Sequence, residues 1–148
     1  MLDKIMVISL LSFPIPSLAA SLDAIDCSKM KNVKASSNDG KQISMAIANI
    51  VNRYQGELVS ITELRVINKV GNWYIVEFEL DKLEPGIMVF RRNANKYELM
   101  GEFGGYVEDE RPENKIRQYL LKKIPSAPKE LFYCYMPKGS PFRHDIEK

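Results

Sequence analysis

The sequence is poor in metal-ligating and redox-active side chains, because its 148 residues include one histidine and two cysteines. A structural zinc site takes its ligands mainly from several Cys and His residues, so this chain cannot supply such a site. The lone histidine, His144, stands close to the C-terminal end, and the chain contains no G-x-S-x-G element of the serine hydrolases. We therefore expect neither a metal site nor histidine-based catalysis.

The net charge is also small: 21 Lys and Arg against 19 Asp and Glu give +2. Nucleic-acid binding depends on a basic excess that neutralises phosphates, and this chain has little. Its glycines form neither a G-x-G-x-x-G pattern nor a P-loop. These absences argue against nucleic-acid and nucleotide binding, and we expect no cofactor.

Long apolar runs are missing after the first twenty residues, which read MLDKIMVISLLSFPIPSLAA. A lysine near the start, a short apolar run and small residues around Ala19 are the parts of a secretory signal peptide. An uncleaved membrane anchor is the alternative, but Pro14 and Pro16 interrupt a run shorter than the roughly 20 apolar residues of a membrane span. We expect residues 1–19 to be a signal peptide, and the mature protein to be periplasmic or secreted with no membrane span.

In an exported protein Cys27 and Cys134 are candidates for a disulfide, because disulfides persist in oxidising compartments. Neither cysteine belongs to a C-x-x-C motif, so a reactive thiol is the weaker alternative. The sequence therefore predicts a disulfide that joins the N-terminal and C-terminal segments of the mature chain.

Apolar residues with helical spacing follow an irregular polar lead-in over residues 20–40. They are Ile43, Ala46, Ile47, Ile50, Val51 and Tyr54. This stripe predicts an amphipathic helix that Asn38 or Asp39 caps and Gly56 ends. A second helix is predicted from about Arg111 or Pro112 to Lys123, because acidic residues precede it and lysines end it.

Between the two helices, apolar residues recur at every second position. This alternation predicts strands at residues 57–70, 73–80, 87–92 and 96–102. Turns are predicted at residues 71–72, 84–86 and 93–95. Because these connections are short, we expect an antiparallel meander. The run at residues 131–136 is interpreted as a short final strand or extended segment, and residues 137–148 as a polar tail.

An antiparallel sheet must cover its apolar face, so we expect the first helix to lie across the four strands in a single α+β domain over residues 20–148. With the second helix and the short C-terminal strand, this element order resembles that of cystatin-like folds. The Gln-x-Val-x-Gly motif of inhibitory cystatins is absent. The resemblance therefore gives no support for protease inhibition by that route.

Trp73 and Ile75 lie on the strand face opposite the one that the first helix is expected to cover. Either the second helix and the C-terminal segment cover them, or they form an exposed apolar patch that marks a partner site. Arg91, Arg92 and Lys96 flank the turn at residues 93–95, where arginines suit the recognition of carboxylate or phosphate groups; a solvated turn is the alternative. These five residues are the predicted partner-binding surface.

Glu77 and Glu79 share one strand face, but the alternation of a half-solvated strand accounts for such a pair. Because the sequence contains no recognisable set of catalytic residues, it favours a non-enzymatic protein that binds another protein. An immunity protein or an inhibitor of an envelope toxin or hydrolase is a concrete example. The alternative is a small-ligand carrier or an enzyme with a pocket between the helix and a curved sheet, lined by Tyr54, Tyr74, Tyr97 and Tyr119.

Overall fold

The computed structural model describes residues 25–55, 61–81, 83–107 and 111–135. The predicted signal peptide and the predicted polar tail lie outside these ranges. Five strands form one antiparallel sheet in the order of the chain: β1 (Lys31–Asn32), β2 (Ile61–Val70), β3 (Trp73–Leu80), β4 (Leu83–Asn93) and β5 (Lys96–Gly104). The helices are the short 3-10 helix η1 (Cys27–Lys29), α1 (Asn38–Gln55), α2 (Pro112–Lys123) and α3 (Lys129–Tyr133).

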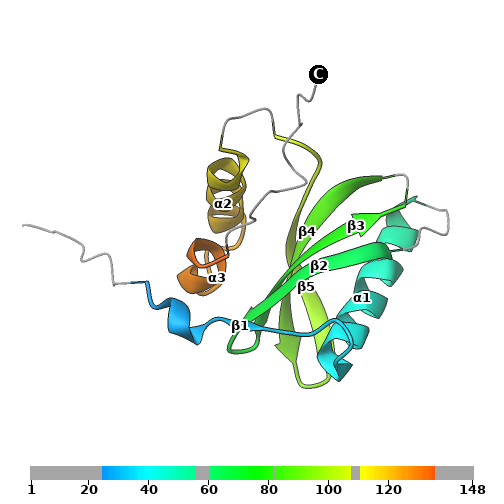
Figure 1. The fold of residues 1–148 in the computed structure, drawn as a ribbon, viewed down its shortest axis with the longest axis horizontal. Coiled ribbons are helices and arrows are strands. Elements are labelled where there is room, and N and C mark those ends of the chain that lie inside the picture. The colour runs from blue at the N-terminus through cyan, green and yellow to red at the C-terminus, as the bar shows by residue number, and fades with distance from the viewer. Residues whose placement is uncertain (1–24, 56–60, 82, 108–110, 136–148) are drawn as a thin grey trace, which may run out of the picture.

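The elements form three layers, with α1 on one face of the sheet and α2 with α3 on the other (Figure 1). The α+β class and the antiparallel meander predicted from the sequence are confirmed. The first helix lies on the sheet as predicted, and α2 and α3 cover the opposite face, because β3 and β4 carry buried residues in unbroken succession. A strand that is apolar on both faces needs cover on both.

The layer between α1 and the sheet is an apolar core in which α1 contributes Ile43, Ile47 and Val51. These residues follow helical spacing, as the sequence predicts. They pack on alternate residues of β3 and β4, such as Phe78 and Phe90, because alternate side chains of a strand share one face.

The start of α1 is fixed by a cap and a close backbone approach. The backbone N–H of Gly40 donates to Oγ of Ser37 at 3.1 Å, so Ser37 caps the helix rather than the predicted Asn38 or Asp39. A Cβ at Gly40 would lie 2.5 Å from the carbonyl oxygen of Ala35, so only glycine fits here. The side chain of Asp39 is thereby left for other contacts.

The opposite layer joins the far ends of the described chain to the sheet. Ile116 and Leu120 of α2, with Leu131 and Phe132 of α3, bury Ile75 and Val89. The predicted disulfide is present: Cys27 at the start of η1 is bonded to Cys134, the C-cap of α3. Lys29 adds an ion pair to Glu130 at 3.1 Å.

Three local predictions are wrong. Residues 129–133 form α3 rather than part of a strand, because Leu131, Phe132 and Tyr135 bury one side of a helical turn that follows Pro128. The predicted turn at residues 84–86 lies inside β4, where Pro85 falls at a register irregularity opposite β3. The lead-in also contains β1, which pairs with β2 through Lys31 and Asn32.

Candidate functional site

Trp73 and Ile75 are not available to a partner in this structure, which corrects two of the five predicted contact residues. Their side chains are 8% and 0% exposed, and both belong to the core beneath α2 and α3. Of the two alternatives that the sequence left open, internal covering is the one observed. The apolar outer face of the sheet is thus a core rather than a binding surface.

Arg91 and Arg92 lie at the same end of the sheet but on opposite faces, as neighbours on one strand must. The Arg91 guanidinium lies 5.7 Å from the centre of the Trp73 ring and pairs with Glu98 at 3.4 Å. Arg92 turns to the α1 face, and its Nε donates to the Ala94 carbonyl at 3.1 Å. Both arginines are therefore held by neighbours while remaining partly exposed.

Asp39 joins Arg92 to the start of α1. Its carboxylate pairs with Arg92 Nη1 at 3.3 Å and with Lys69 Nζ at 3.7 Å. The Tyr74 hydroxyl donates to Asp39 Oδ2 at 3.0 Å. These contacts connect α1, β2, β3 and β4 at one point.

The electrostatics of this point favour the ionised carboxylate. Burial raises the pKa of Asp39, but the hydroxyls of Tyr97 and Tyr74 and the charges of Arg92 and Lys69 outweigh burial, so the pKa lies below its usual value. Burial and the adjacent carboxylate raise the pKa of Tyr97. Asp39 therefore stays charged and fixes Arg92 at neutral pH.

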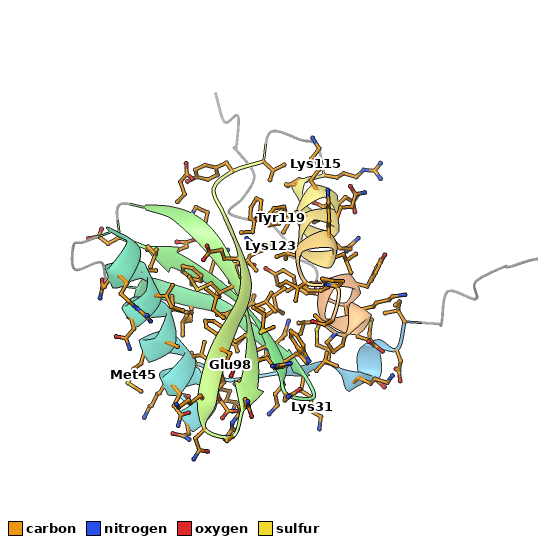
Figure 2. All side chains as sticks on the ribbon, turned by 180° about the vertical axis from the view of Figure 1, so that it is seen from behind. Lys31, Met45, Glu98, Lys115, Tyr119 and Lys123 are labelled. Carbon is orange, nitrogen blue, oxygen red and sulfur yellow. A yellow bond between two sulfur atoms is a disulfide. The ribbon has the colours of Figure 1, made fainter. Side chains whose placement is uncertain are left out.

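Further cations surround this cluster, and we call the whole surface the basic end. It comprises Lys31, Lys34, Lys41, Lys69, Arg91, Arg92 and Lys96, with the carboxylates Asp39 and Glu98. Figure 2 shows Lys31 and Glu98 at this end and Tyr119 on α2 at the other. Within the described ranges no ion pair is formed by Lys31, Lys34, Lys41 or Lys96.

Glu77 and Glu79 lie in different environments, because Glu77 is buried and Glu79 is partly exposed. Glu77 is 2% exposed and accepts a hydrogen bond from the Tyr135 hydroxyl, while Arg65 Nε lies 3.3 Å from its Oε1. Arg65 also pairs with Glu79 at 2.6 Å. A register irregularity between Leu64 and Val66 falls at Arg65 and allows these contacts. The cluster links the sheet to the segment that follows α3.

Among the described side chains, Tyr74, Tyr97 and Tyr119 do not line a common pocket. Tyr74 is buried in the α1 core and Tyr97 is half-buried beside it, with ring centres 5.3 Å apart, whereas Tyr119 is exposed on α2. Ile47, Ile50, Phe78 and Leu99 belong to one apolar cluster between α1 and the sheet. The side chain of Tyr54 lies outside what the structure describes.

Three of the predicted residues lie together at one end of the sheet: Arg91, Arg92 and Lys96. The sequence analysis did not identify the carboxylates that pair with the two arginines. Asp39 is 53 positions from Arg92. Its position in the first turn of α1 and the cations near the hairpins were visible signals, yet only the crossing of α1 over the sheet brings them together.

Comparison of the chain with protein-family models, with curated proteins and with solved structures finds no match. Among the described residues, no group of His, Cys, Asp and Glu is arranged to hold a metal ion. The described helices also include none with the length and apolar character required to cross a membrane.

Proposed function

We propose that this protein is an exported, non-enzymatic binding protein whose basic end engages an acidic surface of another protein. Export rests on the signal-peptide pattern of residues 1–19 and accords with the disulfide. An immunity protein or enzyme inhibitor that acts on an envelope toxin or hydrolase is the specific form that we propose.

The observation that carries the proposal is the fixed placement of the two arginines. Arg91 rests against Trp73 and Glu98, and Arg92 is held by Asp39 and the Ala94 carbonyl. A side chain that is already ordered loses less conformational freedom when it binds. Guanidinium groups held in this way suit carboxylates of a partner, which they can contact through two parallel hydrogen bonds.

The lysines around these arginines supply charge for the encounter. Lys31, Lys34 and Lys96 are exposed, and the described residues offer them no carboxylate within ion-pair distance. A surface of one sign attracts a partner of the opposite sign and raises the association rate. The basic end therefore combines steering lysines with positioned arginines.

In this proposal Trp73 supports Arg91, whereas the sequence analysis predicted that Trp73 contacts the partner directly. The indole is buried beneath the sheet surface and supports the Arg91 guanidinium from below. The stacking of a guanidinium on an aromatic ring contributes about 0.5 to 1 kcal/mol at partly exposed sites. Trp73 thus positions a contact residue and does not itself touch the partner.

The test is capture of a partner from the cell envelope and secreted fraction of the source organism by the oxidised protein, with identification by mass spectrometry. The basic-end variant Lys34→Glu with Lys96→Glu is compared with Lys122→Glu with Lys129→Glu, an equal charge change at exposed positions of α2 and α3. We expect a stoichiometric partner that the wild type and the control capture and the basic-end variant loses. Equal capture by all three proteins, or no partner for the wild type, would contradict the proposal.

A further inference from the structure

A groove lies between the second half of α1 and strands β3, β4 and β5, at the end of α1 remote from the basic end. Its volume is about 570 Å³. This volume falls within the roughly 300 to 1,000 Å³ range of small-molecule sites. Ile50 and Val51 of α1 face Phe78 and Met88 of the sheet across it, so much of its wall is apolar.

The groove is hollow because a cross-strand row of the sheet ends in two glycines. Phe78 pairs with Gly86, and Gly86 pairs with Gly104 on β5. Side chains of directly paired residues share a face, so Gly86 and Gly104 are on the α1 face with Phe78. Two positions that would otherwise carry side chains into this space carry none.

The two glycines contribute in different ways. The ring of Phe78 lies over Gly86, since a Cβ there would be 2.6 Å from the ring. A Cβ at Gly104 would meet no atom within 4 Å. The space above Gly104 is therefore open, whereas Gly86 is needed for the position of the Phe78 ring that forms the floor.

Two carboxylates provide the charge of the groove. Glu84 and Glu102 are among its lining residues, and neither pairs with a cation in the part of the chain that the structure describes. Glu102 is paired with Met88 across the strands, so its side chain shares the α1 face with the apolar wall. An apolar hollow edged by carboxylates favours a ligand with an apolar body and a positive charge.

We propose that this groove binds a small amphipathic cation, in which an apolar body occupies the hollow above Gly104 and an ammonium or guanidinium group lies near Glu102 and Glu84. The groove and the basic end lie at different ends of α1. A failure of the groove to bind a ligand would therefore leave the proposed protein-binding role intact. A failure of the basic end to bind a protein would likewise leave the groove proposal intact.

The test is an amide chemical-shift titration of the full oxidised protein with three probes of one shape. They are 4-phenylbutylamine, the neutral 4-phenylbutanol and the anionic 4-phenylbutanoate. We expect the amine to shift the amides of Gly86 and Gly104, and to bind about fivefold more tightly than the alcohol, as expected for partly exposed charge pairs. The anion should bind most weakly.

Two variants separate the apolar and the ionic contributions. Gly104→Leu places a side chain in open space at a backbone conformation without positive φ, so the protein should fold and lose binding of all three probes. Glu102→Gln should remove most of the preference for the amine over the alcohol. Glu98→Gln, a matched substitution at the other end of β5, should leave that preference unchanged.

The proposal is overturned by any of three results. The first is the absence of probe-dependent shifts at the groove. The second is equal affinity for the amine and the alcohol in the wild type. The third is unchanged binding by Gly104→Leu, once its amide spectrum confirms the native fold.

Discussion

Asp39 shows, at the scale of single residues, how one carboxylate organises a surface. It lies in the first turn of α1, accepts a hydrogen bond from Tyr74 and pairs with Arg92 and Lys69. Because three donors from three strands converge on it, its removal affects both the stability of the fold and the position of Arg92. These two effects can be measured separately.

Asp39→Asn should destabilise the protein by about 1 to 3 kcal/mol at pH 7, because charged hydrogen bonds are lost from a partly buried group. The pKa of Asp39 is lowered in the fold, so its stabilisation is present above the unfolded value of about 3.9 and is lost as the pH falls through the folded value. Urea unfolding from pH 7 to pH 3 should show the difference from wild type shrinking toward the acid end. Asp81→Asn, at an exposed position, is the control, and an equal loss there would contradict this role of Asp39.

Tyr135 anchors the segment after α3 to the buried carboxylate of Glu77. Tyr135→Phe should cost about 1 to 3 kcal/mol at pH 7, because Glu77 loses a donor in a buried site. Burial, and then the charge and hydrogen bond of Glu77, raise the pKa of Tyr135, so its stabilisation is present below the unfolded value of about 10 and declines as the pH rises above it.

Chemical unfolding at pH 7 and pH 11 checks this prediction. The difference between Tyr135→Phe and the wild type should be large at pH 7 and smaller at pH 11. Tyr133→Phe is a matched control two positions away, because Tyr133 is exposed and its ring lies 5.3 Å from the Arg117 guanidinium. A Tyr133→Phe variant as unstable as Tyr135→Phe would show that the buried contact with Glu77 is not the cause.

At the scale of elements, periodicity predicted the long helices and strands because each repeats its pattern several times. The stripe of Ile43, Ile47 and Val51 and the alternation within residues 73–80 are examples. Short elements lack this redundancy. β1 has two residues and α3 five, so the aromatic content of residues 131–136 favoured a strand although the local packing makes a helix.

The candidate site was predictable only in part for a related reason. Cations near the hairpin at residues 93–95 are visible in the sequence, and so is the candidate pairing of Cys27 with Cys134. The burial of Trp73 and Ile75 was one of two alternatives, because alternation shows which side chains share a face but not what covers that face. The hollow above Gly104 depends on cross-strand register, which single-strand patterns do not give.

The disulfide joins Cys27 at the start of η1 to Cys134 at the end of α3, and the two cysteines are 107 positions apart. Replacement of Cys27 and Cys134 by serine should lower the free energy of unfolding by about 2 to 5 kcal/mol, because a long loop in the unfolded chain is no longer closed. Hydrogen exchange should show the amides of α3 losing protection before those of α1. Lys29→Gln removes the neighbouring ion pair alone and should have a much smaller effect. Equal protection of α3 with and without the disulfide would contradict the anchoring role.

At the scale of the whole molecule, the small net charge of +2 hides an uneven distribution. Cations gather at the end where α1 begins, and the groove near the end of α1 is edged by Glu84 and Glu102. The net charge alone therefore does not predict a binding surface. Long-range attraction depends on where the charges lie. Helix α1 runs from the proposed protein-binding end to the proposed ligand-binding groove.

The central claim is that the basic end steers and binds an acidic protein surface. Its most direct measurement is the association rate constant between the oxidised protein and its captured partner, at about 20 mM and about 500 mM salt. We predict a fall of at least about tenfold for the wild type and for Lys122→Glu with Lys129→Glu, because salt screens exposed charges. Lys34→Glu with Lys96→Glu should start slower and depend less on salt. An association rate that salt does not change, or an equal salt dependence in both variants, would contradict the claim.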